Sequence, residues 1–177
     1  MIHINIKTAV TRYVFNRNVV AFHCRCKYDA VINLEASKSI SNRLLIIREL
    51  CDNKFNIENL SNAKDTRILT KILNDFKSQK DIDCEDAGTA LRFSLAFLAT
   101  KDGNWVVSGS KRMHERPIKP LIDCLLELGT ELKYLNKNGF PPIEIKGGEL
   151  KSEKLIIKGN ISSQFISALL MIAPKLE

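Results

Sequence analysis

The stretch from Glu35 to Leu50 combines the residue types that bind anions. Serine and lysine alternate from Ser37 to Ser39, and Arg43 follows directly before an apolar run. A serine that caps a helix accepts hydrogen bonds from the first free backbone N–H groups, and the helix amino terminus carries about half a positive charge. Hydroxyls, N–H groups and the two cations together would bind a phosphate or a carboxylate. Taken alone, the stretch is equally compatible with a solvated helix start.

Two later stretches repeat this arrangement of small polar residues before an apolar helix. The segment 86–92 precedes the apolar run 93–99, and the segment 159–165 precedes the run 166–172. A basic loop occupies residues 109–117. A polar helix start is more often only a cap, so each segment alone is a weak signal. Three such starts with arginines nearby predict one shared anion site, provided that the three helices pack side by side.

Hydrophobic periodicity predicts alternating strands and helices along the chain. The expected strands are Ile2–Ile6, Val19–Phe22, Ala30–Leu34, Phe55–Leu60, Ile82–Cys84, Trp105–Ser108, Leu132–Tyr134, Ile143–Ile145 and Leu155–Ile157. The expected helices cover about 41–51, 63–76, 93–99, 118–128 and 166–172. The order of strand, polar-headed helix, strand, amphipathic helix and strands occurs twice and begins a third time. This order predicts an α/β (α+β) domain of repeated units, with the third unit truncated, and hence a fragment of a longer protein.

The composition is that of a globular protein with an anionic partner. The 177 residues are 45% hydrophobic, and the formal net charge is +7. A basic chain favours a phosphorylated metabolite, a nucleic acid or a membrane surface. The lysines are scattered and the aromatic residues form no stacking array, so nucleic acid is not favoured. No apolar run approaches the roughly 20 residues of a membrane span, and no clean signal peptide is present, so we expect a cytoplasmic protein.

The cysteines predict free thiols and no metal site. The chain has five cysteines, an odd number, and no secretory signal accompanies them. The Cys24-x-Cys26 pair is spaced too closely for the usual zinc ligands, and no second pair follows. Cys51, Cys84 and Cys124 are expected in the core or at its boundary.

Four motifs, in this order, resemble the signatures of the EPSP synthase (3-phosphoshikimate 1-carboxyvinyltransferase) family. They are Ser37–Arg43, Ala87–Arg92, Arg112–Ile118 and Ser162–Met171. The resemblance covers roughly 32–174. It implies a domain of repeated βαβαββ units, of the inside-out α/β barrel type. It also implies transfer of the enolpyruvyl group of phosphoenolpyruvate to the 5-hydroxyl of shikimate 3-phosphate, without a cofactor, in the shikimate pathway of aromatic amino acid biosynthesis.

The resemblance also implies which residues bind the two substrates. Those assigned to shikimate 3-phosphate are Lys38, Ser39, Arg43, Ser162, Ser163 and Gln164. Those assigned to phosphoenolpyruvate are Lys38, Gly88 and Arg112, with Thr89 and Arg92 in support. A structural ion pair is a nearly equal account of Arg92. Glu115 and Arg116 are expected to order their loop.

Three departures from the family pattern matter for function. Glu35 and Ala36 stand where the family usually has Pro-Gly, and Asp86 stands where it has asparagine. Both changes add negative charge near an anion site. Residues 1–28 match no family opening, so we expect a poorly matched segment there, an incomplete EPSP synthase domain over 29–177, and no second domain.

The chain alone is expected to be inactive, because the family's acid–base carboxylates lie in later sequence. Its catalytic residues are therefore unassigned. An exposed apolar edge would promote self-association. The alternative is a non-catalytic anion-binding or interaction module that retains the fold.

Overall fold

The computed structural model describes residues 35–151, 155–157 and 162–176, and the backbone of the strands that precede them. The chain divides into two compact units, Met1–Glu35 and Ala36–Glu177. In the first unit, β1 (Ile2–Asn5) pairs antiparallel with β4 (Asp29–Ile32), and β2 (Val10–Phe15) pairs antiparallel with β3 (Asn18–His23). The prediction of β1, β3 and β4 is confirmed, whereas β2 was not predicted. The Cys24-x-Cys26 pair lies outside the described residues.

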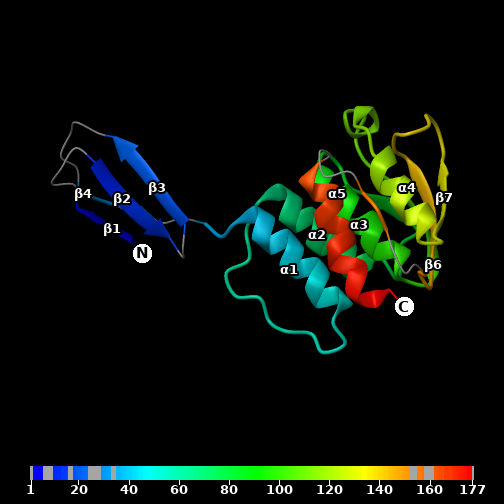
Figure 1. The fold of residues 1–177 in the computed structure, drawn as a ribbon, viewed down its shortest axis with the longest axis horizontal. Helices are drawn as coiled ribbons and strands as arrows, with labels where there is room; N and C mark the ends of the chain where they lie inside the picture. Colours follow the sequence, from blue (N-terminus) through cyan, green and yellow to red (C-terminus); the bar gives the residue numbers. More distant parts are fainter. Residues whose placement is uncertain are drawn as a thin grey trace. The chain divides into compact units, whose positions relative to one another are not determined.

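The helix α3 (Gly88–Ala99) forms the centre of the second unit. Its residues are buried apart from Arg92, as expected for a helix that is apolar on all sides. It packs against α1 (Lys38–Leu50), α2 (Lys64–Asp75) and α5 (Ser163–Ile172), and also against the sheet (Figure 1). α1, α3 and α5 lie against one another. The three helices with polar starts therefore pack side by side, which a shared anion site requires.

A four-stranded sheet covers another side of α3. Its strand order is β5–β6–β8–β7, with bounds β5 (Asp81–Asp83), β6 (Gly103–Ser108), β7 (Glu131–Tyr134) and β8 (Ile143–Gly147). β5 runs parallel to β6, while β8 is antiparallel to both of its neighbours. α3 connects β5 to β6, and α4 (Lys119–Glu127) connects β6 to β7. The chain order from β5 to β8 is therefore one βαβαββ unit.

Short segments complete the second unit and show where periodicity misleads. Two 3-10 helices, η1 (Met113–Glu115) and η2 (Ala173–Lys175), follow β6 and α5. The predicted strands at 55–60 and 155–157 are wrong, since both segments are irregular. Asn59 interrupts the first with a φ of 55°, and Ile156 in the second is 74% exposed. Alternating apolar residues do not form a strand without a partner strand beside them.

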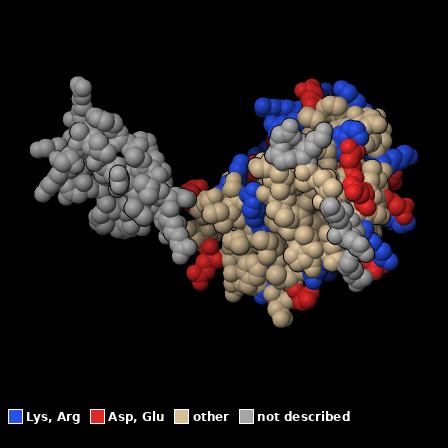
Figure 2. Space-filling view, in the orientation of Figure 1, with Lys and Arg blue, Asp and Glu red and all other residues tan. Residues whose placement is uncertain are grey.

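The cysteines of the second unit agree with the sequence prediction in two of three cases. Cys84 and Cys124 are buried free thiols, whereas Cys51 is exposed, so its predicted place in the core or at the core boundary is wrong. Burial raises the pKa of the Cys84 thiol, so this group is chemically inert. Over α1 and α5 the surface is mostly uncharged (Figure 2). Ile40 on α1 and Leu170 on α5 are exposed apolar residues. Self-association through a truncated apolar edge stays a prediction. No helix in the described ranges is both long and apolar enough for a membrane span.

Candidate functional site

The amino ends of four helices meet at one end of the second unit. Lys38, the first residue of α1, lies 3.5 Å from Asp65 in the first turn of α2. Lys64, the first residue of α2, lies 2.8 Å from Glu85, just before α3. Arg92 of α3 donates a hydrogen bond of 3.2 Å to Gln164 Oε1 in the first turn of α5. We call this region, made of residues 37–43, 64–65, 85–92, 110–116 and 162–167, the helix-head surface.

Serine caps begin two of these helices. Ile40 N donates to Ser37 Oγ at 3.4 Å, and Gln164 N donates to Ser162 Oγ at 3.3 Å. The cap at Ser37 explains why α1 begins at Lys38, three residues earlier than predicted. The start of α3 differs, because Ala87 provides no side-chain cap there. The first N–H groups of α3 are therefore free of a side-chain cap.

Arg43 joins α1 to α5 and α3. Its Nη2 donates to Ser167 Oγ at 2.8 Å, and its Nη1 donates to the Ser39 carbonyl oxygen at 2.9 Å. Its guanidinium carbon lies 5.6 Å from the centre of the Phe93 ring. These contacts hold the Arg43 guanidinium at the helix-head surface. All three partners are neutral, so none of them compensates its positive charge.

Two guanidinium groups lie against the first residue of α3. Arg92 Nη1 donates to the Gly88 carbonyl oxygen at 2.8 Å. A Cβ on Gly88 would lie 2.6 Å from Arg92 Nη1 and 2.9 Å from Arg116 Nη1. Burial, and next the charge of Arg116, lower the pKa of Arg92. Two adjacent cations of this kind are stabilised when an anion binds between them.

These two arginines lack a protein counter-ion where the structure is described. Within residues 35–151, 155–157 and 162–176, neither Arg92 nor Arg116 forms an ion pair with a carboxylate. Arg92 Nε is buried and has no hydrogen-bond partner there. Instead, the Arg92 guanidinium lies 5.2 Å from the centre of the Phe165 ring. The alternative that Arg92 forms a structural ion pair therefore finds no support in the described residues.

The loop before η1 adds further charge beside α3. Ser110 donates a hydrogen bond to Asp86 Oδ1, and Lys64 lies 4.0 Å from Asp86 Oδ2. Arg112 is exposed, and its charge is among the causes that lower the pKa of Asp86. Arg112 therefore adds a positive charge to the loop that Ser110 joins to Asp86.

The structure brings most of the predicted site residues to this surface. Lys38, Ser39, Ser162 and Ser163 are exposed at the starts of α1 and α5, and Thr89 is buried in the first turn of α3. Sequence reasoning missed the positions of Arg116, Lys64 and Ser167. Two sequence signals could have indicated them: Arg116 lies in the basic loop, and Ser167 lies one helical turn after Ser163. The roles of all these residues in binding stay predictions.

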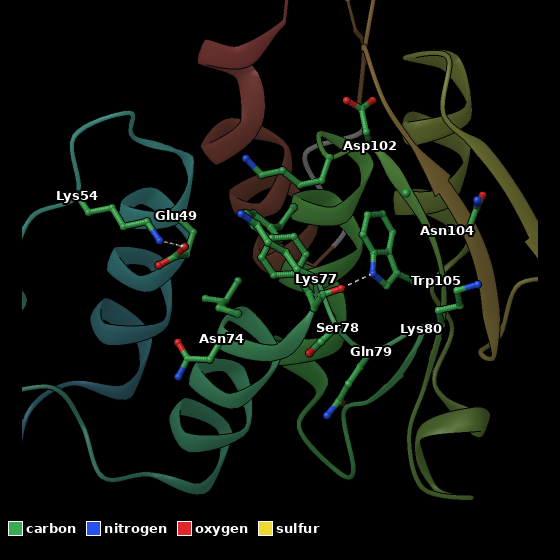
Figure 3. A pocket seen from close by; sticks show the side chains of 15 residues that line it. Glu49, Lys54, Asn74, Lys77, Ser78, Gln79, Lys80, Asp102, Asn104 and Trp105 are labelled. Atoms are coloured by element: carbon green, nitrogen blue, oxygen red, sulfur yellow. Dashed lines mark hydrogen bonds and ion pairs between the residues drawn. The ribbon is translucent and has the colours of Figure 1, made fainter.

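A pocket of about 750 Å³ lies at the opposite ends of α1, α2 and α3. Figure 3 shows that Lys54 is paired there with Glu49, at 2.6 Å, and that Trp105 Nε1 donates to the Phe76 carbonyl oxygen, at 2.7 Å. Lys77 and Lys101 also line it. However, each helix carboxyl end carries about half a negative charge, which disfavours an anion. The helix-head surface is therefore the better anion site.

The donor set of the described residues does not suggest a metal. Within that part of the chain, no group of three or more His, Cys, Asp or Glu side chains could hold a metal ion. The arrangement at the helix heads instead offers helix amino ends, hydroxyls and cations, which bind anions.

Comparison with known protein families gives one match over most of the second unit. Residues 75–177 match the model of EPSP synthase (3-phosphoshikimate 1-carboxyvinyltransferase). The chain is 46% identical over 148 residues to the 3-phosphoshikimate 1-carboxyvinyltransferase of Bacteroides fragilis (strain YCH46), covering 84% of this chain and 36% of the relative. It is 39% identical over 170 residues to the enzyme of the same name from Buchnera aphidicola subsp. Cinara cedri, covering 82% of this chain and 39% of the relative. The chain thus spans little more than a third of these relatives.

A solved structure shares the fold. The EPSP synthase from Acinetobacter baumannii superimposes with a TM-score of 0.73 over 82% of this chain and 38% of that chain, at 17% sequence identity. The mixed α/β arrangement of sheet and helices is therefore the fold of an EPSP synthase.

Proposed function

Because the chain belongs to the EPSP synthase (3-phosphoshikimate 1-carboxyvinyltransferase) family, we propose that its helix-head surface binds shikimate 3-phosphate and phosphoenolpyruvate. The reaction served would be transfer of the enolpyruvyl group from phosphoenolpyruvate to the 5-hydroxyl of shikimate 3-phosphate. Both substrates are anions, and the surface offers helix amino ends and several cations to bind them.

The observation that carries this proposal is the pair of arginines at Gly88. Arg92 and Arg116 both reach to within 3 Å of the position that a Gly88 Cβ would occupy. The missing Cβ lets both guanidinium groups approach the start of α3, and their planar donors suit a carboxylate or phosphate. Hydrogen bonds to charged groups contribute about 1.5–3 kcal/mol each, so two or three of them support micromolar to millimolar affinity.

The two substrates would bind at different parts of the helix-head surface. Phosphoenolpyruvate would lie at Gly88 and Arg112, and Arg116 would be added to its binding residues. Shikimate 3-phosphate would lie between the starts of α1 and α5, where Arg43 contacts Ser167. Lys38 would contact both ligands after leaving Asp65, whose ion pair with it is long and half exposed. We propose the repeated βαβαββ arrangement and the domain limits of the sequence prediction on the same family basis.

Binding without turnover is expected of residues 1–177. A general acid or base needs a free titratable group at the reacting atoms. The carboxylates nearest the starts of α2 and α3 are instead engaged, Asp65 with Lys38, Glu85 with Lys64 and Asp86 with Ser110. These same carboxylates are the observation that favours the second candidate, an anion-binding module that retains the fold without catalysis.

Calorimetric titration tests the proposal. Shikimate 3-phosphate is titrated into the chain first, and phosphoenolpyruvate is added to the resulting complex. Lys38→Met is expected to weaken binding of both ligands by about tenfold, since it removes one charge-assisted contact from each. Lys133→Met, an exposed lysine on β7, is the matched control and should bind as the unchanged chain does. Binding of unrelated polyanions with no binding of shikimate 3-phosphate would favour the non-catalytic module.

A further inference from the structure

Asp86 places a carboxylate among the cations of the helix-head surface. The hydrogen bond from Ser110 holds the pKa of this carboxyl below its usual range, and the charges of Lys64, Arg112 and Arg116 lower it further. The side chain is exposed and lies two residues before Gly88, at the start of α3. Asp86 is therefore a negative charge at the place where the site has to attract an anion.

Glu85 and Asp86 lie at different distances from the same cation, Lys64. The Glu85 carboxylate lies 2.8 Å from Lys64, whereas Asp86 lies 4.0 Å from the same nitrogen. Glu85 thus compensates most of the Lys64 charge. The charge of Asp86 is left for the other cations beside the start of α3, among them Arg116, whose Nη1 would lie 2.9 Å from a Cβ on Gly88.

We propose that Asp86, which Ser110 holds beside the start of α3, competes with the incoming anion for the cations there, and that it thereby sets the affinity of the site for phosphoenolpyruvate. The inference rests on the proposed function. It also predicts selectivity, because Asp86 lies beside the start of α3 and not beside the contact between Arg43 and Ser167. Asp86 should therefore weaken the binding of phosphoenolpyruvate more than the binding of shikimate 3-phosphate.

The substitution Asp86→Asn removes the charge and keeps the shape. The asparagine Oδ1 can still accept the hydrogen bond from Ser110. Repulsion between two unit charges about 4 Å apart in water corresponds to roughly fivefold in affinity. We expect phosphoenolpyruvate to bind about fivefold tighter to the Asp86→Asn chain, while the affinity for shikimate 3-phosphate changes less than about twofold. The gain should shrink as salt is raised, since exposed charges are screened.

Two control variants separate this role from general charge effects. Asp123→Asn removes one negative charge from α4, where Asp123 pairs with Lys119, and should leave both affinities unchanged. Glu85→Gln removes a charge from the same turn but acts on Lys64, so its effect on phosphoenolpyruvate should be smaller than that of Asp86→Asn. Unfolding in urea checks that each variant retains the fold.

The outcomes distinguish the inference from the function on which it rests. Tighter binding of phosphoenolpyruvate to Asp86→Asn alone supports competition by Asp86. Equal or weaker binding to that variant, with the unchanged chain still binding, overturns the inference and leaves the proposed function standing. If neither the unchanged chain nor the variant binds phosphoenolpyruvate after shikimate 3-phosphate, both are overturned.

Discussion

Replacing Gly88 with alanine is expected to weaken phosphoenolpyruvate binding by at least about tenfold without unfolding the chain. The new methyl group would lie 2.6 Å from Arg92 Nη1 and 2.9 Å from Arg116 Nη1, so both guanidinium groups have to move. These atoms end flexible side chains, and moving them costs little. A glycine-to-alanine change in a helix also favours folding by up to about 1 kcal/mol. Binding and stability should therefore change in opposite directions.

Calorimetry and urea unfolding measure the two effects on the same protein. Arg116→Met provides the control, because a methionine there removes one of the two displaced groups. In that background Gly88→Ala should cost less affinity than it does in the unchanged chain, since the two residues share one contact. Unaltered binding by the Gly88→Ala chain would show that the arginine pair does not hold the ligand.

Replacing Gly147 with alanine is expected to destabilise the second unit by about 3 kcal/mol. Gly147 ends β8, opposite Gly103 of β6. A Cβ there would overlap the carbonyl oxygens of Leu98 and Lys101, at the carboxyl end of α3. Backbone atoms cannot rotate away, so β8 would have to separate from the central helix.

The neighbouring glycine gives a matched control for this prediction. A Cβ on Gly148 would meet only Asp102 Oδ1, at 3.7 Å, which is an ordinary contact. Gly148→Ala should therefore change the free energy of unfolding by less than about 0.5 kcal/mol. Urea unfolding of the two variants measures the difference. Equal stabilities would contradict the close packing of β8 on α3.

Local sequence patterns predicted most elements because packing agrees with them. The apolar residues of α3 and the stripe of α4 bury the faces that their spacing indicates. Periodicity failed at 55–60 and 155–157, where the apolar residues are regular but no neighbouring strand pairs with them. The start of α1 was misplaced because any of Ser37, Ser39 and Ser41 could cap a helix, and only the folded chain selects Ser37.

The site was harder to predict, since long-range contacts compose it. Arg92 meets Gln164 across 72 positions of sequence, and Arg43 meets Ser167 across 124. Motif resemblance named three of these residues, but not their contacts. The sequence around Arg116 predicts only a loop residue, because nothing in it indicates that the Arg116 side chain reaches Gly88.

The most direct test maps ligand binding onto the chain by ¹⁵N NMR. Shikimate 3-phosphate and then phosphoenolpyruvate are added, and the backbone amides are followed together with the indole N–H of Trp105, the single tryptophan. We predict shifts at Ser39, Gly88 and Gln164, at the starts of α1, α3 and α5, with the Trp105 indole unmoved. Shifts at Trp105 and Lys101 with unmoved helix starts would place the ligands in the opposite pocket and contradict the proposed function.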